Sequence, residues 1–303
     1  MIHDTSQLEQ DVVNLTTTGR IWYISMVLLL YDYCLTLCDE VHHVWRSRSL
    51  RGRLIFFTNR YWPIAFMVFD SVVLRVFQTS DTGFCHFFFQ WAVYSPIPSS
   101  ISLGIILISK LHAMYGCNRT LLAVMCTLLV VEIVATAAAG GIAAYKMRAV
   151  TVAAHTGCFP GNDYAYDWSF WVPPLGFEAF LFALALWKVV QEVRDDMQTS
   201  RLMVVLLRDS IFYFGAACTI LLINFFVWLF RPALLGAFVP LVTTCRSIIG
   251  CRMLLNIQEA AEMTADTPSD ILPSIQFRTF TVNEEGNNKE CSRYVCHTLT
   301  LLV

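Results

Sequence analysis

Seven apolar stretches, joined by short polar connections, restrict what this chain can fold into. A helix needs about 20 apolar residues to cross a bilayer. A backbone inside hydrocarbon must satisfy its own hydrogen bonds, so each stretch is predicted to be a membrane-spanning helix. The stretches cover roughly residues 21–41, 54–77, 87–115, 120–145, 169–190, 209–230 and 233–256. The predicted fold class is therefore all-α, a polytopic membrane protein with a seven-helix transmembrane bundle.

The composition supports this class. Of 303 residues, 56% are hydrophobic and 15% are charged, whereas a soluble domain carries about 25% charged residues. No basic patch typical of nucleic-acid binding stands out, so the lipid bilayer is the expected partner and nucleic acid is not. The first 20 residues lack the basic start and apolar core of a signal peptide, which predicts an uncleaved first helix. We expect three regions: an extracellular tail (1–20), the bundle (21–256) and a cytoplasmic, disordered tail (257–303).

The basic residues predict the orientation of the bundle. Four arginines lie in the first connection, and further basic residues fall in later connections on the same side: Arg46, Arg48, Arg51, Arg53, Lys110, Arg119, Lys188, Arg194, Arg201 and Arg208. Loops rich in arginine and lysine stay in the cytoplasm, so the N-terminus is predicted outside and the C-terminus inside. Asn14 begins an Asn-Leu-Thr sequon in the outside tail and is a candidate glycosylation site. The expected location is the plasma membrane.

Two local features refine this arrangement. The third apolar stretch contains Pro96 and Pro98, so a kink is expected there. Cys85 precedes that stretch and Cys158 lies in the connection between the fourth and fifth stretches, both on the predicted outer side. An oxidising compartment allows this pair to form a disulfide, and two free thiols are the alternative.

Ionisable residues inside the apolar stretches need a partner or a wet cavity. Asp32 of the first stretch and Arg246 of the last lie at nearly matching depths, and the first and last helices of a seven-helix ring are neighbours. We therefore expect an ion pair between Asp32 and Arg246. It is either a static bridge that fixes packing or a switch or proton relay.

Three more polar residues fall near the middle of the membrane. Glu132, Glu178 and Asn224 lie in the fourth, fifth and sixth stretches at similar depth. They act either as polar contacts that hold helices together or as the lining of a ligand pocket or ion path. With Asp32 and Arg246 they form the candidate intramembrane polar network.

The sequence contains few features that indicate catalysis. The seven histidines are scattered without the HExxH spacing of a zinc site, and no GxSxG marks a serine nucleophile. No catalytic residue, cofactor or metal ligand is assigned, and the chain is not expected to be an enzyme. The last stretch contains no lysine, which excludes a retinal Schiff base of the opsin kind.

One block of sequence resembles a known family. The string YDYCLTLCDEVHHVW, followed by NRYWP, resembles the signature of domain of unknown function 6533, found in seven-span membrane proteins of basidiomycete fungi. It covers roughly residues 22–66, and pieces such as KLHAMYGCNR at 110–119 look similar to the remainder of those proteins. Lys110 and the pair Cys38-Asp39 depart from the pattern. The resemblance implies architecture and location, and it brings no catalytic residue.

These observations predict a receptor-like sensor with a small-molecule ligand and a cytoplasmic signalling partner. The DRY and NPxxY motifs of rhodopsin-like receptors are absent, so coupling to a G protein rests on shape alone. The alternatives are a transporter or channel that uses Asp32, Glu132, Glu178 and Arg246, and, with less support, a membrane enzyme. A cavity open to one face favours a sensor, and a polar path that reaches both faces favours transport.

Overall fold

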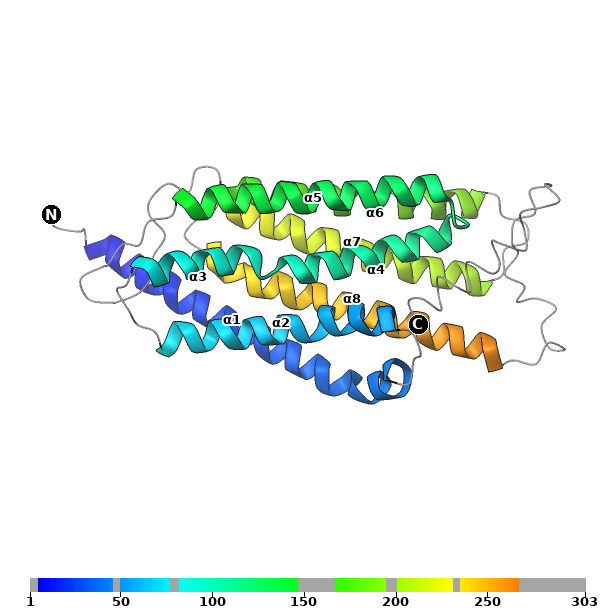
Figure 1. Ribbon diagram of the computed structural model, residues 1–303, viewed down its shortest axis with the longest axis horizontal. Helices are drawn as coiled ribbons and strands as arrows, with labels where there is room; N and C mark the ends of the chain where they lie inside the picture. The colour runs from blue at the N-terminus through cyan, green and yellow to red at the C-terminus, as the bar shows by residue number, and fades with distance from the viewer. Residues whose placement is uncertain are drawn as a thin grey trace.

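The computed structural model describes residues 5–45, 50–76, 82–146, 167–194, 201–230 and 235–266, which are almost entirely helical. Within these ranges the α-helices are α1 (Thr5–Asp39), α2 (Leu50–Val76), α3 (Thr82–Tyr94), α4 (Ile97–Met114), α5 (Arg119–Lys146), α6 (Val172–Arg194), α7 (Arg201–Phe230) and α8 (Leu235–Asp266). A π-helical turn, Glu40–Val44, continues α1, and a 3₁₀ turn, Asp167–Trp171, leads into α6. The helices lie lengthwise beside one another, so the predicted all-helical bundle is confirmed for this part of the chain (Figure 1).

Six stretches of the described residues are long and apolar enough to cross a membrane. They are Thr16–Val44, Gln90–Met114, Arg119–Ile142, Trp168–Gln191, Ile211–Phe230 and Phe238–Asn256. This pattern is that of an integral membrane protein. The predicted span at 54–77 forms α2, which is not one of the six. Asn59, Arg60 and Asp70 lower its hydropathy, and all three side chains are buried inside the bundle.

Some boundaries differ from the prediction. Helix α1 begins at Thr5 rather than near residue 21, and α8 continues to Asp266 rather than ending near residue 256. At the expected kink the regular helix is interrupted at Ser95 and Pro96, between α3 and α4, although Pro96 keeps helical backbone angles. The amide of Ser95 still donates to the carbonyl of Trp91 (2.9 Å), but Pro96 and Pro98 have no amide hydrogen to continue the helix.

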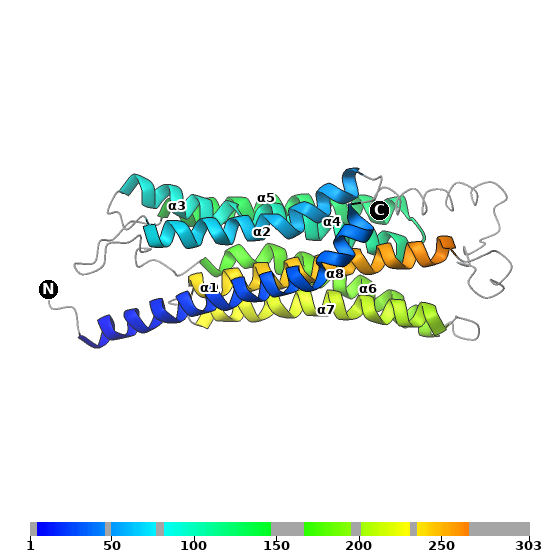
Figure 2. The same ribbon diagram turned by 90° about the horizontal axis from the view of Figure 1, so that it is seen from below.

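Helix α8 lies at the centre of the packing. It contacts α1, α2, α4 and α7, and it is the most buried of the six candidate spans. Helix α1 runs alongside it, so the expected contact between the first and last helices is confirmed (Figure 2). Polar side chains on α8 therefore face several helices at once.

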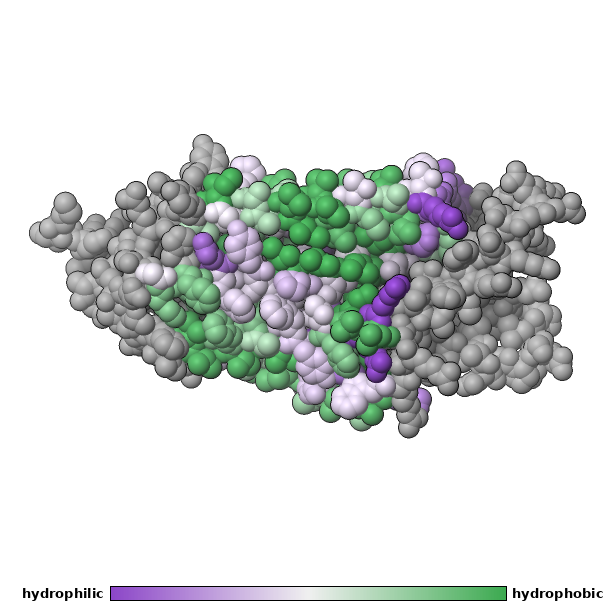
Figure 3. Space-filling model, in the orientation of Figure 1, coloured by the Kyte–Doolittle hydropathy of each residue, from purple (hydrophilic) through white to green (hydrophobic). Residues whose placement is uncertain are grey.

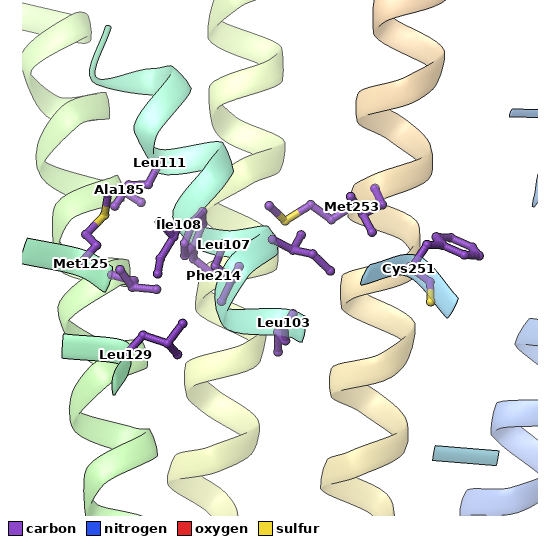
Figure 4. Packing of buried hydrophobic residues seen from close by; sticks show 14 of the residues in the cluster. Leu103, Leu107, Ile108, Leu111, Met125, Leu129, Ala185, Phe214, Cys251 and Met253 are labelled. Carbon is purple, nitrogen blue, oxygen red and sulfur yellow. The ribbon is translucent and has the colours of Figure 1, made fainter. Parts of the chain in front are cut away.

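Apolar side chains fill the half of the bundle in which α4 ends and α5 begins. Leu103, Leu107 and Leu111 follow one face of α4 at intervals of four residues and are almost completely buried. Side chains of the neighbouring helices pack against them, including Met125, Leu129, Ala185, Phe214 and Met253 (Figure 4). We call this cluster the apolar plug.

The surface is that of a protein surrounded by lipid. Large apolar side chains point outward from several helices, among them Ile24, Val134 and Phe212, each more than half exposed. Figure 3 shows apolar side chains over the middle of the visible face, with the most hydrophilic ones gathered mainly toward the end where α4 meets α5. That end also carries Arg51, Arg53 and Arg119.

Candidate functional site

A buried ion pair joins the end of α1 to α2. Glu40, the first residue of the π-helical turn, is completely buried, and its Oε2 lies 2.9 Å from Nε of Arg60. Its Oε1 accepts hydrogen bonds from the hydroxyl of Tyr61 (2.7 Å) and the indole of Trp45 (3.1 Å). Oε1 is therefore hydrogen-bonded, and Oε2 is held by the ion pair alone, without a hydrogen bond of good geometry. A charge in a low-dielectric interior requires such a partner.

Both terminal nitrogens of the Arg60 guanidinium donate hydrogen bonds. Its Nη1 donates to Oγ1 of Thr36 (2.8 Å), and its Nη2 donates to the carbonyl of Tyr33 (3.0 Å). The same group lies 4.8 Å from the centre of the Tyr33 ring, a cation–π contact. We call Tyr33, Thr36, Glu40, Trp45, Arg60 and Tyr61 the Glu40 brace, because they fix the chain reversal between α1 and α2.

A second polar contact fixes α2 against α8. The amide of Asn59 donates to the carbonyl of Ser247 (3.0 Å), and the hydroxyl of Ser247 donates back to the carbonyl of Asn59 (2.7 Å). Gly250 lies so close that a Cβ at this position would come within 2.6 Å of Nδ2 of Asn59. The absence of a side chain at Gly250 therefore permits this close approach.

The expected ion pair between Asp32 and Arg246 is wrong. Asp32 binds Arg252, with Oδ1 lying 2.8 Å from Nη2 and 2.9 Å from Nε. Arg246 binds Glu178 instead, with Nη1 lying 2.9 Å from Oε1. Six residues separate the two arginines on α8, which turns them toward different neighbours: α1 for Arg252, and α4 and α6 for Arg246. The depth of a residue in the membrane, estimated from its position in the sequence, does not reveal which face of the helix it occupies.

Arg246 is the centre of the candidate site. Besides Glu178 of α6, it contacts α4, because its Nη2 donates to Oγ of Ser100 (3.0 Å). Glu132 of α5 interacts electrostatically with both Arg246 and Glu178, although it forms no ion pair within 4.0 Å among the described residues. The predicted network thus brings together Arg246, Glu178 and Glu132, while Asp32 lies elsewhere.

A cavity of about 50 Å³ adjoins these charged groups. Its lining comes from α3, the α3–α4 break, α4, α5, the 3₁₀ turn, α6 and α8: Val93, Pro96, Ile97, Ser99, Ser100, Glu132, Ile133, Thr136, Phe170, Trp171, Pro174, Val242, Thr243 and Arg246. Eight of these fourteen side chains are apolar or aromatic and six are polar. Sites for drug-sized ligands measure about 300–1,000 Å³, so this space suits only a ligand of a few heavy atoms. We call this space the Glu132 cavity.

The cavity and the apolar plug occupy opposite halves of the bundle. Ile97, Ser99 and Ser100 begin α4, whereas the plug residues from Leu103 to Leu111 complete it. The plug residues are almost completely buried and entirely apolar. On the plug side the cavity therefore adjoins a packed apolar cluster, although Ser102 and His112 of the same helix α4 are also buried there.

Several oxygen atoms of the cavity lining have no hydrogen-bond partner among the described residues. They belong to Glu132 (Oε2), Thr136 (Oγ1) and Ser99 (Oγ), and each of the three side chains is more than nine-tenths buried. Thr136 lies one turn beyond Glu132 and near its carboxyl, but no hydrogen bond of good geometry joins them. Buried polar atoms are normally satisfied, so these unpaired acceptors mark the cavity as a candidate binding site.

The remaining predicted site residues have separate outcomes. Asn224 of α7 is buried, and neither its amide nitrogen nor its oxygen hydrogen-bonds to a described residue, so no hydrogen bond joins it to Glu132 or Glu178. Cys158 and the side chains of Cys85 and Asn14 lie outside the part of the chain that the structure describes, so the candidate disulfide and glycosylation site stay predictions.

The prediction assigned no role to several buried polar residues that join helices, among them Glu40, Asn59 and Arg60. Arg60 was available as a signal, because an arginine inside an apolar run needs a buried partner, and Glu40 is the nearest acidic residue on the preceding helix. The hydroxyls of Ser99 and Thr136 carry no comparable signal, since serine and threonine occur throughout membrane helices. Only the packed structure places them beside Glu132.

Residues 23–65 match a family of unknown function (DUF6533). No match to this chain is found among curated proteins. The matched segment runs from the middle of α1 through the π-helical turn to the middle of α2, so it contains every residue of the Glu40 brace and also Asn59. The matched sequence therefore coincides with the structural connection of α1, α2 and α8, while the Glu132 cavity lies outside it.

Proposed function

We propose that this chain is a receptor-like, non-enzymatic sensor of the fungal plasma membrane, with a small ligand in the Glu132 cavity and a signalling partner on the cytoplasmic side. The fungal origin follows from the resemblance of the signature block. The observation that carries the proposal is the position of the cavity in one half of the bundle, with the apolar plug packed in the other half. A ligand that enters such a cavity contacts several helices at once.

The proposal includes seven spans, with α2 as the additional one. Its 27 residues are long enough to cross hydrocarbon. The polar side chains that lower its hydropathy face inward, as shown by the buried Asn59, Arg60 and Asp70. With seven spans, the N-terminus and the C-terminus lie on opposite sides of the membrane. The arginines near the start of α2 favour a cytoplasmic C-terminus.

Helix α8 is the proposed route from the cavity to the cytoplasmic side. Arg246 faces the cavity, Ser247 contacts α2 and Arg252 pairs with α1, all on one continuous helix. A ligand that changes the interaction of Arg246 with Glu178 therefore acts on a helix that also contacts α1 and α2. In this proposal the helices have two arrangements in equilibrium. Ligand binding shifts that equilibrium toward one of them.

One-sided accessibility tests the proposal. In full-length protein whose native cysteines have been replaced, Ile97→Cys reports on the cavity, and Leu107→Cys on the same helix reports on the plug. A membrane-impermeant, thiol-reactive cation applied to cells should label Ile97→Cys from outside and leave Leu107→Cys unlabelled from either side. Labelling of both positions, or of Ile97→Cys from both faces, would indicate a transport path and would contradict the sensor.

A further inference from the structure

The ionisable groups at the Glu132 cavity do not balance. Two carboxylates, Glu132 and Glu178, face one guanidinium, Arg246. That guanidinium is already used, because it pairs with Glu178 and donates to Ser100. Glu132 is the carboxyl that remains without an ion pair among the described residues, although it is 95% buried, with a relative exposure of 5%.

We propose that the Glu132 cavity binds the protonated primary amine of a small ligand with an apolar body. This deepens the proposed function, on which it rests, by assigning the chemical class of the ligand. A cation beside Glu132 completes the charge balance, and an intramembrane carboxylate without a cationic partner is costly.

The unpaired oxygens of the lining suit an ammonium group. A primary ammonium has three N–H donors and no acceptor. The cavity offers three buried acceptors without partners among the described residues: Glu132 Oε2, Thr136 Oγ1 and Ser99 Oγ. A charged donor to a carboxylate forms a strong, short hydrogen bond, and the hydroxyls supply the additional acceptors.

The remaining lining suits an apolar body rather than a bare metal ion. Val93, Ile133 and Val242 line the same space, and the indole N–H of Trp171 adds a buried donor without a hydrogen-bond partner among the described residues. A hard cation such as calcium takes six to eight oxygen ligands, about twice the number of unpaired oxygens here. An alkyl or aromatic group attached to the amine would instead be stabilised, because transfer of apolar surface from water to these side chains is favourable.

Matched ligands and variants test this assignment. Purified full-length protein in lipid nanodiscs is titrated with n-butylammonium, with its neutral analogue n-butanol, and with tetramethylammonium, which is cationic but has no N–H donor. Thermal unfolding and calorimetry measure binding to the wild type, to Glu132→Gln, and to Asp70→Asn. Asp70 is an equally buried carboxyl that accepts a hydrogen bond from Trp91 and lies outside the cavity lining.

We expect n-butylammonium to raise the melting temperature saturably in the wild type and in Asp70→Asn. Its Kd should rise at least about tenfold in Glu132→Gln, because an amide offers no charge to the ammonium. Tetramethylammonium should bind more weakly than n-butylammonium, and n-butanol should not bind saturably. Absence of saturable amine binding to the wild type, or an unchanged Kd in Glu132→Gln, would overturn the proposal.

Two outcomes separate this inference from the function on which it rests. Saturable binding of n-butanol equal to that of the amine would exclude the amine class and leave a ligand cavity in place. Labelling of Ile97→Cys from both membrane faces, together with amine binding that depends on Glu132, would contradict the sensor and keep the amine site.

Discussion

The Glu40 brace and the Glu132 cavity are both built from charges inside the bundle, and they differ in how completely those charges are paired. In the brace, Glu40 forms an ion pair with Arg60, and Oε1 of Glu40 and both Nη atoms of Arg60 form hydrogen bonds. At the cavity, Arg246 is paired, but Glu132 keeps an oxygen without a hydrogen bond to a described residue. A fully paired cluster stabilises the fold, whereas an unpaired acceptor beside a cavity is available to a ligand.

The two clusters also differ in how tightly their surroundings are packed. Phe56 lies against the guanidinium of Arg60, and Val44 at the end of the π-helical turn is completely buried. The cavity instead adjoins the break between α3 and α4, where two prolines interrupt the helix. A buried charge therefore does not indicate function by itself, and its unpaired atoms and adjoining space are the more informative features.

The largest expected effect comes from Arg60. Arg60→Ala leaves Glu40 buried without its ion pair and also removes the contacts to Thr36 and Tyr33, so it should cost about 3–5 kcal/mol of unfolding free energy. Titration with sodium dodecyl sulfate in mixed micelles measures this value. Arg51→Ala, at an exposed position on the same helix, is the control and should change stability by less than about 0.5 kcal/mol. Equal effects of the two variants would show that the brace does not stabilise the fold.

A smaller loss is expected at the contact between α2 and α8. Gly250→Ala places a methyl group against the side chain of Asn59, which cannot move without losing its hydrogen bond to Ser247. The expected cost is about 1–3 kcal/mol in the same titration. Gly176→Ala is a matched control, because nothing lies within 4 Å of its added Cβ. If both substitutions are neutral, α2 and α8 are not packed as closely as described.

The smallest of these losses is expected at the ion pair between α1 and α8. The side chain of Arg252 is 48% exposed, so the pair is partly solvated and Arg252→Ala should cost about 1 kcal/mol or less. Arg252→Lys keeps the charge and should recover part of that loss. A cost as large as that of Arg60→Ala would mean that partial exposure does not separate the two pairs.

Much of the bundle was predictable because the signals are long and redundant. Apolar stretches of 20 residues predict helices. Pro96 with Pro98 predicts a kink in the third stretch, and the structure has an interruption between α3 and α4 at this point. The ends were less predictable: helix α1 begins at Thr5 because a polar segment can continue a helix beyond its apolar part. The apolar pattern predicts where the membrane-spanning segment begins and ends, but the helix itself can extend beyond that segment.

The site was predictable only in part. The depth of a residue in the membrane follows from its position along a helix, whereas the direction in which its side chain points does not. Glu132, Glu178 and Arg246 were expected to be buried polar residues, and the structure brings them together. The partner assigned to Asp32 was wrong, since Arg252 rather than Arg246 faces α1. The cavity depends on the break between α3 and α4 and on the rotation of six helical segments, which a single sequence does not record.

The contrast between the two clusters is tested most directly by removing one charge from each. Glu40→Gln and Glu132→Gln make the same chemical change at two buried carboxyls, and their unfolding free energies are measured side by side in mixed micelles without added ligand. We expect Glu40→Gln to lose about 2–4 kcal/mol, because a paired charge is removed from Arg60. Glu132→Gln should be neutral or slightly more stable, because it removes an unpaired carboxyl. A loss in Glu132→Gln equal to that in Glu40→Gln would show that Glu132 is as firmly bound into the fold as Glu40, which would contradict this account.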